Sequence, residues 1–254
     1  MDELLDRNFA VPSLCDALAI CTWNVRGLTD LKLFELILHM KRYDIDILCI
    51  QETWVSNSEV KDEQGYTVIL SGADVDSRSW AGVGFIIAPR CRHMVKSYKQ
   101  VSDRICTLRM KVVGGILGLV TAYAPHNLHS LPDRFQFYVE LDIHFRKLSA
   151  NVAKIIVGDL NARLGAQLPG EDHIIGPFTF GRRAAHQVEA PNRDLLLEFC
   201  ESCGLMVANT FVQGLPEEKA TYMGPGASRM GPVCEEKYNM LDIFLCDGTV
   251  LNRC

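Results

Sequence analysis

The sequence has no apolar run long enough to cross a bilayer, and its first residues, Met1 to Asp6, are acidic rather than basic. A membrane-spanning helix needs about 20 apolar residues, and a secretory signal begins with positive charge. The chain also lacks a surplus of basic residues: its formal net charge is -5. It therefore has no overall attraction to nucleic acid or acidic membranes. No cluster of Lys and Arg marks a nuclear signal, so we expect an intracellular protein, nuclear or cytoplasmic, without a membrane partner.

A zinc centre is not expected either. Cys200 and Cys203 are three residues apart on an expected helix, but no His lies near them in the sequence. Cys21, Cys49 and Cys106 lie in apolar runs and are typical of small buried hydrophobic side chains. We favour free thiols in a reducing compartment over structural disulfides.

No internal repeat and no low-complexity tract divides the 254 residues, of which 48% are hydrophobic. We therefore expect a lead-in segment over residues 1–17 and one domain over residues 18–254. The domain begins with a strand over Leu18–Trp23, an amphipathic helix over Leu31–Met40 and a second strand over Ile45–Ile50. This alternation indicates an α/β layered fold.

The middle of the chain is rich in expected strands, and two further helices follow. The strands are Tyr66–Leu70, Val83–Ala88, Met94–Tyr98, Ile105–Val112 and Ile116–Tyr123, and the turn Val113–Gly115 predicts a hairpin between the last two. One helix should follow Ser130 over Phe135–Leu148. Another should begin with Asn192 as its N-cap and run to Cys203. Short strands over Leu205–Asn209 and Ala220–Tyr222 and a last strand over Met240–Cys246 complete the pattern.

The segment Lys154–Arg163 is the most informative part of the chain. Ile155–Val157 is wholly apolar and β-branched, which predicts a strand buried on both faces that ends at Gly158. Asp159 and Asn161 follow in alternate positions, so in an extended backbone they point to the same side. Two polar groups at the mouth of a buried strand favour a chemical role. An ordinary Asx-rich turn is the alternative.

Polar side chains end or interrupt several of the expected apolar strands. They are Asn24, Glu52, Tyr123, Asp159, Asn161 and Asp242. If the strands share a layered sheet, these groups meet at one edge, where sites usually form. Carboxylate and amide oxygens suit Mg²⁺ or Mn²⁺ rather than zinc. The sequence therefore predicts a site for one of these two ions, which a phosphate oxygen could complete.

The order of short motifs in the chain resembles that of the endonuclease/exonuclease/phosphatase superfamily, which includes pancreatic deoxyribonuclease and the abasic-site endonucleases. The motifs are N-V-R-G-L, Q-E-T, Y-A-P, G-D-L-N-A and L-D-I-F, between Ala19 and Cys246. Residues 180–211 also resemble the version found in endonucleases of non-LTR retrotransposons. That resemblance is carried by Gly181, Arg182, Asn192, Leu196–Cys200 and Leu205–Phe211.

The resemblance implies a four-layered α/β sandwich of two packed mixed β-sheets flanked by helices. It also implies metal-dependent hydrolysis of phosphodiester bonds in DNA. Glu52 would be the main ligand of Mg²⁺ or Mn²⁺, with Asn24 beside it. Asp159 would orient or deprotonate the attacking water, and Asn161 would hold that water or the phosphate. Tyr123 would donate a hydrogen bond to the phosphoryl oxygen.

One family motif is absent. In the family, the Asp matched by Asp242 orients a catalytic His that belongs to a Ser-Asp-His motif farther along the chain. No Ser-Asp-His occurs here, and the last His is His186. We therefore expect either a domain without its last strand or strands, or a degenerate copy with little activity. His126 or His129 could approach the site instead, but a position in a surface loop is the favoured interpretation of both.

Contacts to substrate are expected from cations, an aromatic residue and an amide near the site. We assign them to Arg26, Trp54, Arg163, Arg182 and Asn192. Further candidate cations that we expect in loops are Arg78, Arg183 and Arg193. A solvated rim of charges is the alternative. We expect a monomer that acts on DNA, derived from a retrotransposon, with a reverse transcriptase domain in a longer parent protein. A phosphatase or exonuclease on another phosphoester and a catalytically impaired pseudoenzyme are the competing hypotheses.

Overall fold

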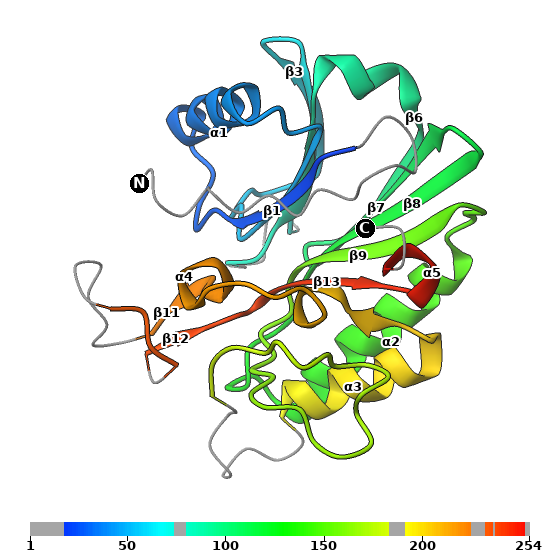
Figure 1. Cartoon of the computed structure of the whole chain (residues 1–254). Coiled ribbons are helices and arrows are strands. Elements are labelled where there is room, and N and C mark those ends of the chain that lie inside the picture. Colours follow the sequence, from blue (N-terminus) through cyan, green and yellow to red (C-terminus); the bar gives the residue numbers. More distant parts are fainter. Residues whose placement is uncertain (1–17, 74–79, 183–190, 225–231, 236, 252–254) are drawn as a thin grey trace.

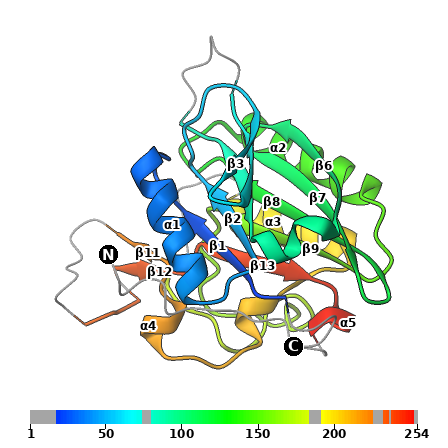
Figure 2. The same cartoon turned by 90° about the horizontal axis from the view of Figure 1, so that it is seen from above.

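The computed structural model describes residues 18–73, 80–182, 191–224, 232–235 and 237–251. The expected lead-in over residues 1–17 lies outside them, as do Arg78, Arg183 and His186. Two mixed β-sheets pack face to face, with helices on both outer faces (Figures 1 and 2). The expected four-layered sandwich is thus confirmed.

The first sheet has five strands in the order β1-β2-β5-β4-β3. They are β1 (Ile20–Asn24), β2 (Ile47–Gln51), β5 (Val83–Ile87), β4 (Tyr66–Ser71) and β3 (Glu59–Glu63). Every residue of β2 and β5 is buried, as their apolar sequences predict. Helix α1 (Asp30–Arg42) covers the outer face, and the side chain of its N-cap Thr29 accepts a hydrogen bond from the backbone N of Lys32.

The second sheet has six strands in the order β10-β13-β9-β8-β7-β6. They are β10 (Met206–Val207), β13 (Asp242–Cys246), β9 (Ala153–Asp159), β8 (Gly115–Tyr123), β7 (Ile105–Val112) and β6 (Val95–Ser102). Strands β7 and β8 form the expected hairpin, with Val112 opposite Gly115. The outer face is covered by α2 (Leu131–Lys147), which Ser130 caps, and by α3 (Asn192–Cys203).

The remaining elements are short. They are the 3₁₀ helices η2 (Pro89–Met94) and η3 (Ala208–Thr210), the helices α4 (Pro216–Lys219) and α5 (Gly248–Leu251), and the two-stranded sheet of β11 (Tyr222–Met223) and β12 (Tyr238–Asn239). None of the helices in the described part of the chain is both long and apolar enough to span a bilayer. The eight cysteines that the structure describes are free thiols.

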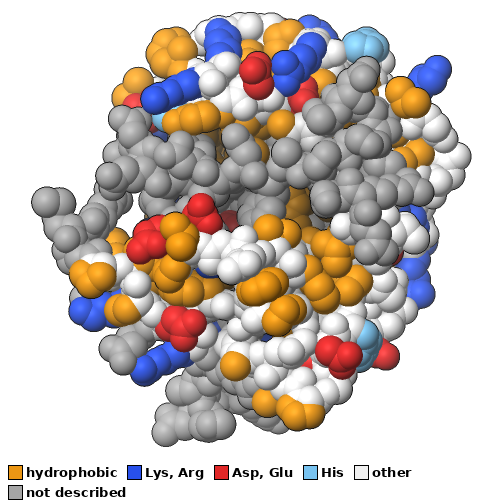
Figure 3. Space-filling model, in the orientation of Figure 1, with side chains coloured by type: hydrophobic (Ala, Val, Ile, Leu, Met, Phe, Trp, Pro, Cys, Tyr) orange, Lys and Arg blue, Asp and Glu red, His pale blue; other side chains and the backbone are white. Residues whose placement is uncertain are grey.

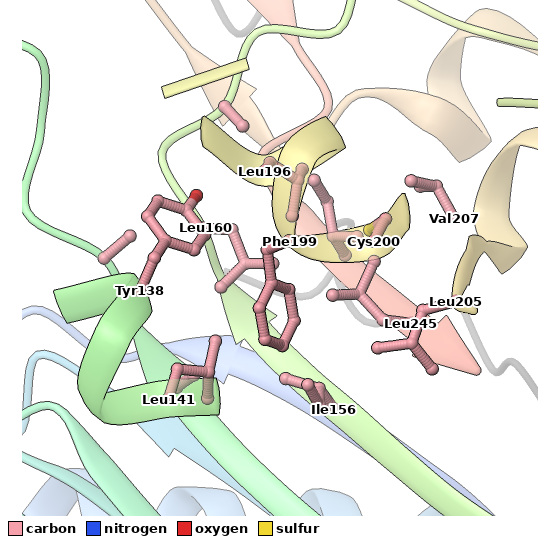
Figure 4. Packing of buried hydrophobic residues seen from close by; sticks show 14 of the residues in the cluster. Tyr138, Leu141, Ile156, Leu160, Leu196, Phe199, Cys200, Leu205, Val207 and Leu245 are labelled. Atoms are coloured by element: carbon pink, nitrogen blue, oxygen red, sulfur yellow. The ribbon is translucent and has the colours of Figure 1, made fainter. Parts of the chain in front are cut away.

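Strand β9 lies between two hydrophobic layers. Ile155 and Val157 pack into the core between the sheets, whereas Ile156 faces α2 and α3. Figure 4 shows Ile156 below Phe199 of α3, with Leu141 of α2 to one side. The alternation of side chains in a strand explains why the whole run is apolar. The expectation of a strand buried on both faces is confirmed.

Three local expectations differ from the structure. Gly158 lies inside β9 and does not end it. A Cβ at this position would lie 2.0 Å from the backbone O of Ala122, so only glycine allows the two strands to approach this closely. Pro191, not Asn192, is the N-cap of α3. The strand expected over Leu205–Asn209 shortens to two residues, because η3 follows directly.

Candidate active site

Strand register brings the predicted polar residues to one edge of the sandwich. In the second sheet, Tyr123 pairs with Asp159 across parallel β8 and β9, and Asp159 pairs with Asp242 across antiparallel β9 and β13. In the first sheet, Asn24 ends β1 beside Gln51, which ends β2. The residue after Gln51 is Glu52, with the uncommon backbone angle φ 53°.

Hydrogen bonds join the two sheets at this edge. The Nδ2 of Asn24 lies 2.7 Å from Oε1 of Glu52 and 2.9 Å from Oδ2 of Asp159, and donates to both. The hydroxyl of Tyr123 donates to the same Oε1 of Glu52 at 3.0 Å. Four predicted residues, at the ends of β1, β8 and β9 and directly after β2, thus form one connected group, although Asn24 and Asp159 are 135 positions apart.

Asn161 reaches this group through its backbone. Its N donates to Oδ1 of Asp159 at 3.0 Å, and its side-chain Nδ2 donates to the backbone O of Ala124 at 2.8 Å. Asn161 has a φ of 48°, so it lies in the left-handed region rather than in an extended strand. The expected side-by-side exit of Asp159 and Asn161 from an extended strand is therefore wrong. The backbone N–H of Asn161 bonds the Asp159 carboxylate two residues before it, as in the Asx turn that was the alternative.

Burial and a neighbouring negative charge raise the pKa of both aspartates; the charge is that of Asp242 for Asp159 and that of Glu52 for Asp242. For Asp159, burial is the largest cause, the charge of Asp242 adds to it, and the bond from Asn24 opposes it. For Asp242, burial again raises the pKa, while the Thr221 hydroxyl and the charge of Arg26 lower it. Negative charge is thus concentrated in a desolvated place, which is an arrangement that a bound cation would relieve.

The Tyr123 hydroxyl is a proton donor in this site. Burial raises its pKa well above the ordinary value, and the neighbouring charges of Glu52 and Asp159 raise it further. The phenol therefore keeps its proton at physiological pH. Arg104 lies over the same ring, with its guanidinium 5.1 Å from the ring centre.

The donor set fits a magnesium-like ion better than zinc. Within the described residues, no three His, Cys, Asp or Glu side chains are grouped closely enough to hold a metal alone. A hard cation that keeps most of its waters needs fewer protein ligands, and Glu52 with the Asn24 amide beside it suits such an ion. Oδ1 of Asp242 is buried without a hydrogen-bond partner, so a cation bound nearby would compensate this oxygen.

A polar link between the sheets lies directly behind the site. Gln51 is fully buried, accepts a hydrogen bond from the Thr22 hydroxyl and donates to Oγ1 of Thr121, each at 3.1 Å. The sequence places Gln51 in the motif Q-E-T but assigns it no role of its own. The available signal was a long polar side chain at the end of an otherwise apolar strand, next to Glu52.

Thr221 is a second residue that sequence analysis missed. Its Oγ1 accepts hydrogen bonds from the backbone N of Leu241 at 2.9 Å and of Asp242 at 3.1 Å. It therefore holds the start of β13, where Asp242 enters the site. Nothing in the local sequence around Thr221 indicates this role, because its partners lie 20 and 21 positions away.

The arginines predicted to contact substrate differ in how far they are exposed to solvent. Arg26 is exposed, and its guanidinium lies 5.9 Å from the centre of the Tyr222 ring. Its positive charge also lowers the pKa of Asp242. Arg163 is half-buried, two positions after Asn161. Arg182 is exposed beside Gly181, which packs against Asn239 of β12.

Trp54 forms an aromatic pair that the sequence did not reveal. Its ring meets that of Trp80 edge to face, with ring centroids 5.0 Å apart. Trp54 is 40% exposed and Trp80 is 72% exposed. The Trp54 ring packs against Gly27, where any Cβ would lie 2.5 Å from it. The pair thus stands at the rim of the loops that carry Asn24 and Glu52.

Two residues differ from the sequence expectation. Asn192 is fully buried, so the predicted contact with substrate does not fit its position. Arg193, expected in a loop among the DNA-facing cations, belongs to α3 and is buried in an ion pair with Glu171. In both cases the polar residue sits at the start of a helix whose first turn is enclosed by other loops.

The two histidines considered as substitutes for the missing one lie together. The rings of His126 and His129 have centroids 4.3 Å apart, and Nδ1 of His126 accepts a hydrogen bond from the backbone N of Leu128. Among the described residues, no contact joins either ring to Glu52, Asp159 or Asp242. The structure therefore offers no support for either His as the missing catalytic group.

Comparison with known proteins gives a consistent result. The model of the Endonuclease/Exonuclease/phosphatase family matches residues 21–202. Craniofacial development protein 2 of Bos taurus is 31% identical over 209 residues, which are 81% of this chain and 33% of that protein. The same protein of Tragulus javanicus is 30% identical over an equal length, 81% of this chain and 34% of the relative. The chain thus spans about a third of the length of these curated relatives.

Solved structures share the fold at low sequence identity. An AP endonuclease from Archaeoglobus fulgidus has a TM-score of 0.62 and 17% identity, with 92% of this chain and 88% of that one covered. The endonuclease domain of TRAS1, a telomere-specific non-LTR retrotransposon, has a TM-score of 0.59 and 16% identity, covering 91% and 85%. The 3′ phosphatase NExo from Neisseria, bound to product DNA hairpin, has a TM-score of 0.61 and 15% identity, covering 92% and 88%.

Proposed function

Because the chain belongs to the endonuclease/exonuclease/phosphatase family, a family of nucleases and phosphatases, we propose that it is a Mg²⁺-dependent endonuclease that hydrolyses phosphodiester bonds of DNA. The observation that supports this proposal best is the connected group of Asn24, Glu52, Tyr123 and Asp159 at one edge of two sheets. Their types are those required for binding a hard cation, for donating a hydrogen bond and for activating water.

Each residue has a role that its contacts allow. Glu52 would hold Mg²⁺ or Mn²⁺ with Asn24 alongside, and the ion would polarise the phosphoryl oxygen and offset its charge. Asp159 faces the same space and would orient the attacking water and take its proton. The Tyr123 hydroxyl, which now donates its hydrogen bond to Glu52, would donate it to the phosphoryl oxygen as negative charge builds there. As water adds to phosphorus, its proton would pass to Asp159; the bond to the leaving oxygen would break, and that oxygen would take a proton from solvent water.

Asn161 and Asp242 complete the proposed site from the second sheet. Asn161 fixes one oxygen of Asp159 with its backbone N and would hold the water or the phosphate. Asp242 lies beside Asp159, and its backbone N is held by Thr221. Its charge keeps the pKa of Asp159 raised, which favours proton uptake from water.

DNA is the proposed substrate because of the groups at the rim. Arg26, Arg163 and Arg182 supply guanidinium groups suited to phosphate. The exposed pair of Trp54 and Trp80 offers faces on which a base can stack. Lys and Arg side chains on the face shown in Figure 3 are scattered and form no large basic field. Binding would therefore depend on these local groups.

A retrotransposon origin is proposed on two grounds. Residues 180–211 carry the retrotransposon-like motif order, and the TRAS1 domain shares the fold. The matched 209 residues are 33% of the curated relative from Bos taurus. A longer parent protein with a reverse transcriptase domain is part of the same proposal. We propose that the domain itself acts as a monomer.

Two competing functions have support of their own. A 3′ phosphatase shares the fold, so release of phosphate from a DNA end is a second candidate. A binding protein with impaired chemistry is the third, because the sequence contains no Ser-Asp-His. The fold does not decide between them.

Nicking of supercoiled plasmid with Mg²⁺ and with EDTA tests the proposal. We expect nicking only with Mg²⁺, and a loss of about 10²- to 10⁴-fold for Asp159→Asn if Asp159 takes the proton. Glu52→Gln should lose activity and the rise in melting temperature that Mg²⁺ gives the wild-type protein. Glu198→Gln, on the exposed side of α3, is the control and should behave as wild type.

Other outcomes point elsewhere. Release of inorganic phosphate from 3′-phosphorylated oligonucleotides without nicking would favour the phosphatase. Failure of a folded protein in both assays would favour the binding protein.

A further inference from the structure

We propose that Asn192, the first residue of α3, is a positioning residue that fastens the loop after β8 to the loop after β9. Tyr123 and Asp159 are the last residues of these two strands, directly before the loops, so Asn192 would set the distance between the phenol and the carboxylate. The inference rests on the proposed function for its catalytic consequence, but its structural part can be tested without any activity.

The contacts of Asn192 reach both loops at once. Its side-chain Nδ2 donates to the backbone O of Pro125 at 2.7 Å and of Asn161 at 3.3 Å. Its backbone N donates to Oδ1 of Asn127 at 2.9 Å. Since both side-chain partners are carbonyl oxygens, only the NH₂ end of the amide can face them. One residue thus uses three donors to hold positions 65 to 67 and 31 away in the sequence.

The two loops are already joined closer to the catalytic groups. The backbone N of Ala124 donates to the backbone O of Asp159 at 2.9 Å, and Nδ2 of Asn161 donates to the backbone O of Ala124 at 2.8 Å. Asn192 adds an outer link from a third element. That link bonds the carbonyl of Asn161, whose left-handed φ of 48° persists only if its surroundings hold it.

The neighbouring Arg193 fixes the start of α3 in place through its own hydrogen bonds. Its Nη1 and Nη2 donate to the two carboxylate oxygens of Glu171 at 2.8 and 2.6 Å, and its Nε donates to the backbone O of Leu164 at 2.6 Å. A bidentate pair of this kind fixes orientation as well as distance. Leu196 and Phe199, farther along α3, pack in the core over β9 (Figure 4).

Direct contact with substrate is not an alternative, because Asn192 has no exposed surface. A general contribution to stability is the alternative, and it predicts that any buried hydrogen bond of similar type would behave alike. Thr210 supplies the matched control. Its Oγ1 is fully buried, accepts from the backbone N of Gly176 at 2.7 Å and donates to the backbone O of Val207 at 2.6 Å.

The experiment compares Asn192→Asp with Thr210→Val. Asp has the shape of Asn but brings a carboxylate, without donors, to two carbonyl oxygens. Hydrogen exchange of the metal-free protein, read by mass spectrometry, should speed up about ten-fold in residues 123–127 and 159–163 of Asn192→Asp. Thr210→Val should lower the melting temperature while leaving exchange in these two segments as in the wild type.

Kinetics of Mg²⁺-dependent nicking provide the second measurement. For Asn192→Asp we expect kcat to fall about 10- to 100-fold, because small displacements of catalytic groups are costly. The KM for DNA should stay within two-fold, since Asn192 does not touch substrate. Thr210→Val should keep both constants within two-fold, measured well below its melting temperature.

The outcomes separate this inference from the proposed function. A wild-type protein that does not nick would overturn the proposed function, whereas faster exchange confined to the two loops would still support the positioning role. Unchanged exchange in both loops of Asn192→Asp would overturn it. So would equal losses of kcat in Asn192→Asp and Thr210→Val.

Discussion

Gln51 and Thr121 meet across the interface of the two sheets, where Nε2 of Gln51 donates to Oγ1 of Thr121 at 3.1 Å. Their positions are 70 residues apart, and nearly everything around them is apolar. Gln51 directly precedes Glu52, and Thr121 lies two residues before Tyr123. This hydrogen bond therefore helps to fix the position of Glu52, beside the first sheet, relative to Tyr123 of the second sheet.

Replacing Gln51 by Leu should test this link. The two threonine hydroxyls that now bond Gln51 would lose a buried partner, so we expect a loss of about 1–3 kcal/mol in the free energy of unfolding. Urea unfolding measures it. Nicking should fall by more than the unfolded fraction explains, because Glu52 loses its support. A stability loss with full activity in the folded protein would contradict this view.

Tyr123→Phe isolates one hydroxyl. The variant removes a donor to Glu52 while keeping the ring that packs beneath Arg104. If the hydroxyl stabilises the transition state, kcat should fall by about 10²–10³-fold. The melting temperature should change little. A variant that loses only affinity for DNA would show that the phenol binds substrate instead.

Gly158→Ala should be strongly destabilising. The added Cβ would lie 2.0 Å from the backbone O of Ala122, and the φ of 154° is one that side chains rarely adopt. We expect a loss of about 3 kcal/mol or more in the free energy of unfolding. Gly170→Ala is the control, since its φ is also positive but no atom lies within 4 Å of the new Cβ. Urea unfolding of both variants should give a much smaller loss for Gly170→Ala.

Asp46 should make stability depend on pH. Burial alone would raise the pKa of its carboxyl group, but hydrogen bonds from Arg90, Cys91 and the backbone N of Ala19 outweigh burial and lower it. A folded pKa below the unfolded value means that this stabilisation is present above the unfolded pKa of about 4 and is lost as pH falls through the folded pKa.

The variant Asp46→Asn separates this contribution from other acids. We expect the wild type to be more stable than the variant at pH 7, and the difference to shrink as the pH falls below about 4. Urea midpoints of both proteins between pH 3 and pH 7 measure it. A difference that stays constant over this range would show that Asp46 contributes by packing rather than by charge.

Local pattern alone identified most of the strands and the polar residues that meet at one edge of the sandwich. Strand β7 was expected over the residues it occupies, and the glycines after it predicted the hairpin. Buried strands are recognisable because continuous apolar residues have no other stable place. Strand β3 was missed for the converse reason: its sequence, Glu59–Glu63, is polar and largely exposed, so it carries no such signal.

The sequence by itself therefore determined the layered α/β class and the polar residues at the ends of the apolar strands, because both follow from residue type and spacing. Tertiary structure alone decided which partners those groups meet. Asn192 became a buried link between two loops, Arg193 an internal ion pair with Glu171, and Trp80 the neighbour of Trp54. Hydrogen bonds and ring contacts join positions that are distant in sequence, and only the packing of the two sheets and their helices brings such positions together.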